Sequence, residues 1–150
     1  MDGANLTYDD SWTVAQARDA YFARNGFSEA GYESRWVPLR LGPVRLYLPN
    51  TASRRRAVWV HDLHHVATGY ATDWRGEAEI GAWELGAGCG RYWAAWALDL
   101  GVVAVGAVIA PRRTWRAFQR GRRSRSLYHR GRSDALLAMT VGELRRELGL

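Results

Sequence analysis

The stretch VWVHDLHHVATGYATDWRGEAEIGAWE occupies residues 58–84, and no other part of the sequence gathers so many potential metal ligands. It contains three of the four histidines, His61, His64 and His65. Because an α-helix turns by about 100° per residue, His61 and His65 lie on one face with Asp62 beside them. His64 falls on the other flank of His61 and ranks below them as a ligand. Since neutral imidazoles and carboxylates are ordinary zinc ligands, His61, Asp62 and His65 predict a divalent metal site.

Glu77, on the next predicted helix, is the fourth expected ligand. The short connector after His65 favours an antiparallel helix pair, which would bring Glu77 to the two histidines. Gly81 and Glu84 share the face of Glu77 and leave an open groove, which a ligand or the backbone of another helix would fill. We expect Glu84 beside the metal, as a catalytic proton acceptor or as a partner that orients a ligand.

Other interpretations of these residues stay open. Histidines four apart on a helix commonly form a surface or hydrogen-bonded pair, and an adjacent acid can simply fix a tautomer. Glu77 would also suit the first turn of a helix, where the dipole favours a carboxylate. Zinc metalloproteases need Glu in place of Asp62, and HD phosphohydrolases need a histidine upstream of His61, so both classes fit poorly. The clustering of these features in a histidine-poor chain favours the metal site.

The flanking segments predict a mainly α fold, a helical domain with a small N-terminal β-hairpin. A capping box that begins at Thr13 predicts a helix over residues 14–24. Alternating apolar residues over 35–50, interrupted by Gly42 and Pro43, predict the hairpin. After a polar connector over 50–56, helices are expected over residues 57–70, 74–85, 92–110 and 140–147, with a basic amphipathic helix in the first half of 112–132.

Length and composition point to one domain. In a chain of 150 residues, residues 1–50 would form the helix-and-hairpin region and residues 58–150 the metal-binding, lipid-associated core. The 47% hydrophobic content and eight Trp exclude a disordered chain. Cys89 is the only cysteine, which excludes an internal disulfide and a cysteine-based zinc site and fits a reduced, intracellular compartment. The polar, acidic N-terminus differs from a signal peptide.

The most apolar run covers residues 93–110 and is interrupted by one charge, Asp99. A membrane-spanning helix needs about 20 apolar residues, and a central Asp costs roughly 2.5–3.5 kcal/mol on insertion scales. We therefore expect a buried or membrane-apposed helix rather than a span. Its side chains would line a tunnel for an isoprenoid tail or belong to an ordinary core, and both interpretations stay open.

All 21 basic residues are arginines, and the net charge is +6. Arg112, Arg113 and Arg116 predict a contact with anionic lipid, where each charge near the surface contributes about 1 kcal/mol. Trp115 and Phe118 would enter the membrane interface beside them. A solvated basic face is the alternative. A basic nucleic-acid-binding module is a third hypothesis, but no recognisable nucleic-acid motif accompanies the charge, so no nucleic acid partner is expected.

The spacing HDxxH-x11-E, met by His61, Asp62, His65 and Glu77, resembles the signature of the coenzyme Q (ubiquinone) biosynthesis protein four family. The similarity continues in order, and its further segments are GEAEIGAWELGAG (76–88), WRAFQRGRRSRSLY (115–128) and GELRRELGL (142–150). It covers residues 58–150, whereas residues 1–50 match less well, so the chain resembles a distant or subfamily member.

The resemblance implies a mostly helical fold with a divalent metal, zinc being the expected ion, at the four motif positions. It implies a cytoplasmic location, peripheral to the inner face of the membrane, and a groove for a polyprenyl tail. It points either to oxidative decarboxylation or hydroxylation of a prenylated hydroxybenzoate-type precursor, or to a non-catalytic lipid-binding scaffold. The expected partners are that precursor or another lipid, an anionic membrane surface, other quinone-biosynthesis proteins and a second copy of the chain.

Overall fold

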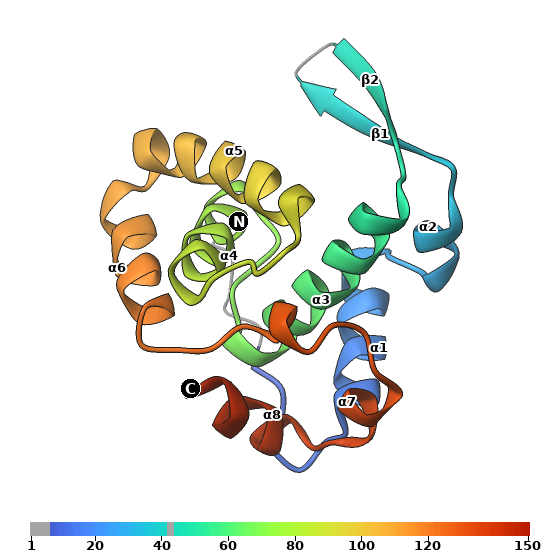
Figure 1. The fold of residues 1–150 in the computed structure, drawn as a ribbon, viewed down its shortest axis with the longest axis vertical. Coiled ribbons are helices and arrows are strands. Elements are labelled where there is room, and N and C mark those ends of the chain that lie inside the picture. The colour runs from blue at the N-terminus through green and yellow to red at the C-terminus, as the bar shows by residue number, and fades with distance from the viewer. Residues whose placement is uncertain (1–6, 42–43) are drawn as a thin grey trace.

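The computed structural model describes residues 7–41 and 44–150 and is mainly helical, as predicted (Figure 1). In chain order the elements are α1 (Val14–Asn25), α2 (Glu29–Glu33), β1 (Trp36–Leu41), β2 (Val44–Pro49), α3 (Ala52–Thr68), α4 (Trp74–Ala87), α5 (Trp93–Ile109), α6 (Pro111–Gly121), the 3-10 helix η1 (Leu127–His129), α7 (Asp134–Ala138) and α8 (Val141–Leu148). Sequence periodicity missed α2, η1 and α7, because elements of three to five residues are too short to display a period.

α3 begins five residues earlier than predicted, so the expected connector over residues 50–56 is largely wrong. Thr51 is the N-cap, and its hydroxyl accepts a hydrogen bond from the Arg54 amide at 3.2 Å. Alanine and arginine are good helix formers, which lets the first turns of α3, Ala52 to Arg56, form although they contain no large apolar residue. The helix ends at Gly69, whose φ of 79° only glycine adopts easily.

α4 lies at the centre of one half of the molecule, with α5 and α6 wrapped around it (Figure 1). Gly121 of α6 lies so close to the Trp83 carbonyl of α4 that any side chain there would clash. Gly81 meets Val102 of α5 in the same way, so α5 occupies the groove predicted beside Glu84. The predicted antiparallel pairing of α3 with α4 is wrong, because α4 packs mainly on α5 and α6 and crosses α3 (Figure 1).

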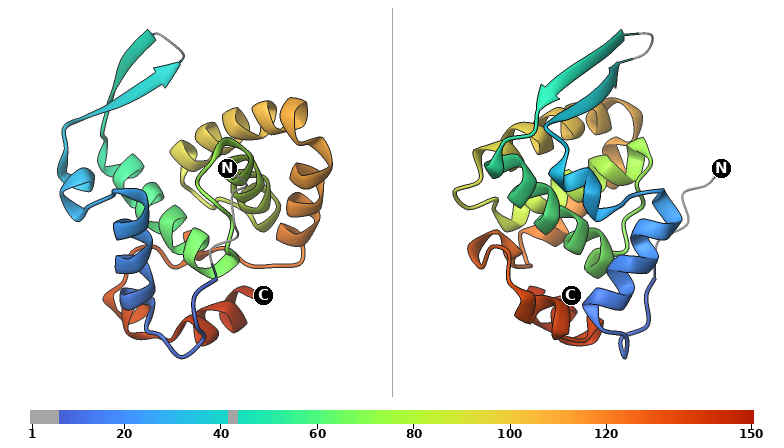
Figure 2. Two further views of the ribbon diagram at one scale, coloured as in Figure 1. Left: turned by 180° about the vertical axis from the view of Figure 1, so that it is seen from behind. Right: turned by 90° about the vertical axis from the view of Figure 1, so that its right-hand side faces the viewer.

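α3 connects this half to a second group formed by α1, α7 and α8 (Figure 2). The two predicted capping boxes, which begin at Thr13 and Thr140, are both present. These two threonines also form a β-bridge, and the Val14 amide donates to the Met139 carbonyl at 2.8 Å. The start of α1 is thereby fixed to the start of α8. Buried side chains from both groups, with Trp59 of α3 among them, join in one core, and Tyr21 and Phe22 of α1 pack with Val66 and Val141 in a second, smaller cluster.

β1 and β2 form an antiparallel pair that projects from the helices (Figures 1 and 2). Trp36 lies opposite Pro49, and Leu41 lies opposite Val44. The predicted turn at Gly42 and Pro43 lies outside the described residues. The strands are tied to the helices at Asn50, whose side chain donates to the carbonyl of Tyr32 at 2.9 Å.

α5 forms part of the outer surface and leaves much of its apolar side chain area uncovered. Val108 is 82% exposed, and Trp93 and Leu100 are also exposed. Asp99, the one charged residue of this helix, faces inward and is only 2% exposed. Among residues 7–41 and 44–150, none of the helices combines the length and apolar character needed to cross a membrane.

Candidate metal centre

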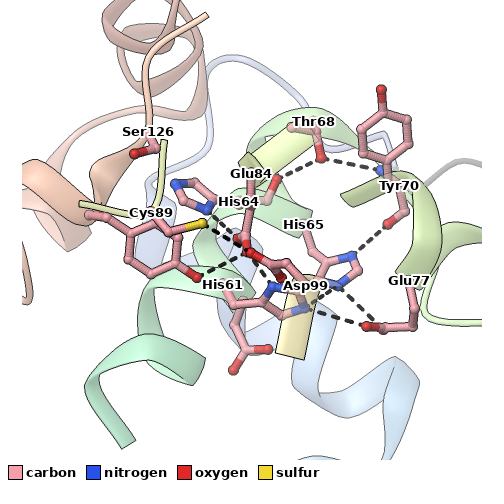
Figure 3. Close-up of polar contacts among 12 residues, drawn as sticks. His61, His64, His65, Thr68, Tyr70, Glu77, Glu84, Cys89, Asp99 and Ser126 are labelled. Atoms are coloured by element: carbon pink, nitrogen blue, oxygen red, sulfur yellow. Dashed lines mark hydrogen bonds and ion pairs between the residues drawn. The ribbon is translucent and has the colours of Figure 1, made fainter. Parts of the chain in front are cut away.

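His61 and His65 of α3 meet Glu77 of α4 at one point (Figure 3). The Nε2 atoms of the two histidines lie 3.1 Å apart. Glu77 places one carboxylate oxygen 3.4 Å from His61 Nε2 and the other 3.4 Å from His65 Nε2. Three of the four predicted ligands are therefore brought together, although α3 and α4 cross instead of lying antiparallel.

The Nδ1 atoms of both histidines have acceptors, which fixes the ring orientation. His65 Nδ1 lies 2.9 Å from the Tyr70 carbonyl oxygen, which can only accept. His61 Nδ1 lies 3.1 Å from a carboxylate oxygen of Glu84. Each Nδ1 therefore carries a proton, and the two Nε2 atoms are the nitrogens that face each other and Glu77. Tyr21 stacks on His65 with 5.6 Å between the ring centroids, and this contact holds the His65 ring in place.

His64 has both ring nitrogens occupied by other partners. Its Nε2 accepts the Leu127 amide proton at 2.9 Å, so its Nδ1 carries a proton and donates to Glu84 at 2.5 Å. The residue is fully buried. Burial lowers the pKa of His64 more than the adjacent Glu84 raises it, so the ring is neutral. His64 therefore anchors η1 to α3 and has no nitrogen free for a metal.

Glu84 is the centre of this buried network. It is 0% exposed and accepts hydrogen bonds from His61, His64 and the Tyr128 hydroxyl, the last at 3.0 Å. Burial raises the pKa of Glu84, but the two histidines lower it by more, so the carboxyl stays ionised. The same carboxylate and that of Glu77 raise the pKa of His61 well above its usual range against the opposing effect of burial.

Asp99 and Cys89 extend the network on the side of α5. The Cys89 thiol donates to Asp99 at 3.2 Å, and both residues are buried. Burial, and next the nearby Glu84 carboxylate, raise the pKa of Asp99 to about 9. Asp99 is therefore protonated at neutral pH. With His61 and Glu84 it forms a second group of potential ligand atoms, but Glu84 already accepts three hydrogen bonds there.

Asp62, the fourth predicted ligand, has different partners. The Tyr21 hydroxyl donates to one of its oxygens at 3.2 Å, and the Tyr32 hydroxyl donates to the other. Burial raises the pKa of Asp62, and the Tyr32 hydrogen bond partly offsets that rise. Asp62 does not belong to the group formed by His61, His65 and Glu77. It follows His61 on α3 and so points about 100° away around the helix.

A cavity of about 480 Å³ opens onto this site. His61, Asp62 and Glu77 contribute to its wall, and Asp99 reaches it from α5. The remaining wall is mostly apolar, with Phe22, Phe27, Val58, Leu98 and Val102 among the lining side chains. The site is therefore open to an apolar ligand that carries a polar group.

The predicted lipid-contact residues lie on or near α6 and differ in their surroundings. Trp115 is 59% exposed, and Arg112 and Arg116 are also exposed. Arg113 is exposed as well, and it donates two hydrogen bonds to Glu79, at 3.0 and 2.7 Å. Phe118 is partly buried against the core, where it stacks with Trp115 at 5.6 Å.

Sequence reasoning missed the tyrosines of the site. Tyr21, Tyr32 and Tyr128 come from three elements, and their hydroxyls reach the site only through the tertiary fold. Asp99 was noted only as an interruption of an apolar run, yet a carboxyl at the buried face of such a helix is itself a signal of a polar partner. The chain matches no protein-family model, no curated protein and no solved structure.

Proposed function

We propose that this chain binds one divalent metal ion, with zinc expected, through His61, His65 and Glu77. The observation that carries the proposal is the pair of inward-facing Nε2 atoms, 3.1 Å apart, with Glu77 oxygens at 3.4 Å from each. Bonds of 2.0–2.1 Å at a tetrahedral centre separate ligand atoms by about 3.3 Å, which agrees with this spacing. A fourth position would face the cavity.

The chain's own groups orient the proposed ligands. Glu84 and the Tyr70 carbonyl accept the Nδ1 protons of His61 and His65, which leaves both Nε2 lone pairs available. When bound, the metal would act as a Lewis acid that polarises a substrate oxygen. Because Glu84 is fully buried, we assign it the positioning of His61 instead of the catalytic contact expected from the sequence.

We further propose that the ligand is a prenylated hydroxybenzoate-type precursor of a quinone, as the family resemblance suggests. Its ring carboxyl group would leave as CO2 and be replaced by a hydroxyl group, with dioxygen as the two-electron oxidant, because zinc is redox-inactive. The mainly apolar cavity supports this choice, since it offers surface for a hydrocarbon tail beside the proposed metal ligands. The uncovered apolar side of α5, next to Arg112, Arg116 and Trp115, supports a peripheral contact with anionic membrane, from which such a substrate would be taken.

Metal analysis of the purified protein tests the proposed metal site. The wild type is expected to retain one equivalent of metal, and His61→Ala and Glu77→Gln should lose it. His129→Ala is the matched control, because His129 is exposed and belongs to neither group of potential ligand atoms. Circular dichroism must show that the variants stay folded. Metal content that is the same in all four proteins would refute the site.

Quinone profiling in a deletion strain tests the substrate. Accumulation of a prenylated precursor that still carries its ring carboxyl group is expected, with rescue by the wild type and none by folded His61→Ala. Rescue by metal-free His61→Ala would instead indicate a non-catalytic scaffold. An unchanged quinone pool in the deletion strain would reject the role in quinone biosynthesis.

A further inference from the structure

A second polar region of the same cavity lies at the start of α3. Arg54 and Arg55 both line the cavity. Arg54 donates to the Asn50 side chain at 3.1 Å, and Arg55 donates to the Asn50 carbonyl at 3.0 Å. The Arg54 Nε is buried and finds no acceptor among the described residues. Arg54 therefore lines the cavity with one guanidinium donor, Nε, left without a partner in the described part of the chain.

The two arginines also lack a counter-charge. Within residues 7–41 and 44–150, no carboxylate lies within ion-pair distance of either, whereas Arg18 and Arg113 pair with glutamates at 2.8 and 2.7 Å. The first turn of α3 contains no acidic residue, so the positive end of the helix dipole adds to the same charge. Burial lowers the pKa of Arg54, as expected for a cation held from water without an anion.

Arg54 and the two proposed histidine ligands lie along one side of α3. Arg54 and His61 are seven residues apart, which is two turns and about 10 Å along the axis, on nearly the same face. Val58 lies between them and lines the cavity as they do. The cavity thus has a cationic end, an apolar middle and a carboxylate-and-histidine end.

We propose that Arg54, assisted by Arg55, binds the carboxylate or phosphate group of an amphiphilic ligand whose hydrocarbon part extends along α3 toward His61. The planar guanidinium suits such anions, because it donates paired hydrogen bonds in a fixed fork. The proposal rests on the cavity of the proposed function, but it requires neither the metal nor the quinone.

Calorimetric titration of the full chain with decanoate, decyl phosphate, decanol and inorganic phosphate tests this subsite. We expect decanoate or decyl phosphate to bind, and Arg54→Gln to weaken that binding by about 10- to 100-fold, as for a lost charged hydrogen bond. Arg56→Gln is the matched control, because Arg56 is exposed on the same turn and its loss should change binding less than twofold. Decanol should bind weakly and equally to all variants.

Several outcomes would overturn the subsite: decanol that binds as tightly as the anions, Arg54→Gln without effect, or equal losses in both variants. Inorganic phosphate that binds as tightly as decyl phosphate would remove the amphiphile from the proposal. Arg54→Lys is a second variant that remains informative if Arg54→Gln does not fold. It keeps the positive charge and should lose less affinity for the anions than Arg54→Gln does. Repeating the titrations with metal-free His61→Ala distinguishes the anion subsite from the proposed metal site. Anion binding that depends on Arg54 should persist in this variant even if the metal proposal fails.

Discussion

The Nε2 atoms of His61 and His65 face each other at 3.1 Å from positions one helical turn apart on α3. Their Nδ1 protons are directed to Glu84 and to the Tyr70 carbonyl. Two lone pairs at this distance repel, so the pair is stable only with a cation between the nitrogens. Without metal that cation is a proton, which the glutamates favour by raising the pKa of His61 well above its ordinary value.

Metal binding should therefore release a proton. Between pH 6.5 and the raised pKa of His61, the metal-free pair holds a proton that the ion must displace, so apparent affinity should rise up to tenfold per pH unit. Above that pKa, affinity should level off. Calorimetric titration with Zn²⁺ at pH 7.0 in two buffers of different ionisation enthalpy measures the protons released. Identical enthalpies in the two buffers would contradict the arrangement.

Replacing Glu84 should weaken metal binding although Glu84 is not a proposed ligand. Glu84→Gln removes the charge that orients His61 and leaves donors of His64 or Tyr128 without a strong acceptor. We expect a 10- to 100-fold loss of metal affinity and about 1–3 kcal/mol of lost stability. Glu147→Gln, which removes only an exposed pair with Arg130, is the control. If both variants behave alike, Glu84 has no positioning role.

Replacing the carboxylate by an amide should have different effects on metal binding at Asp62 and at Glu77. Asp62→Asn is expected to retain the metal but to lose about 1–2 kcal/mol of stability, since both Tyr21 and Tyr32 donate to its oxygens. Glu77→Gln should lose the metal, because Glu77 faces both Nε2 atoms. Metal analysis and urea denaturation of the two variants measure the difference. Equal loss of metal would show that Asp62 is a ligand, as the HDxxH spacing predicts.

Local signals in the sequence predicted most of the helices, whereas the contacts that complete the site depend on residues far apart. The Thr13 and Thr140 capping boxes involve neighbours three residues away and were identified correctly. The histidine pair likewise follows from one helical turn. Nothing local, however, brings Tyr128 to Glu84 across 44 residues, or turns Asp62 toward Tyr32. Those partners are determined by how α1, α2 and η1 pack on α3.

The α5–α6 surface should bind anionic vesicles if the chain is membrane-peripheral. Arg116→Gln should weaken sedimentation with phosphatidylserine vesicles about fivefold, because each surface cation contributes about 1 kcal/mol. Val108→Asp should weaken it further, since Val108 is the most exposed apolar residue of α5. Arg24→Gln on α1 serves as a control of equal charge. Equal binding of all three variants, or none by the wild type, would contradict this contact.

The buried carboxyl of Asp99 should make stability depend on pH. Its pKa is about 9 in the folded chain, against an ordinary value of 3.8 for an aspartic acid. Between these values the folded state binds more protons than the unfolded state, so stability falls as pH rises. Asp99→Asn cannot ionise, and its amide can replace the protonated carboxyl beside Glu84 and still accept from Cys89.

The free energy of unfolding of Asp99→Asn, relative to wild type, should therefore rise from pH 5 to pH 9 and then level off. Urea denaturation at pH 5, 7 and 9 measures this difference, and ionisable groups unaffected by the substitution cancel in it. Asp19→Asn, at an exposed position on α1, should show no such rise. If Asp99→Asn also shows none, Asp99 is ionised in the folded protein. The network would then contain two buried anions, Glu84 and Asp99, close to His61.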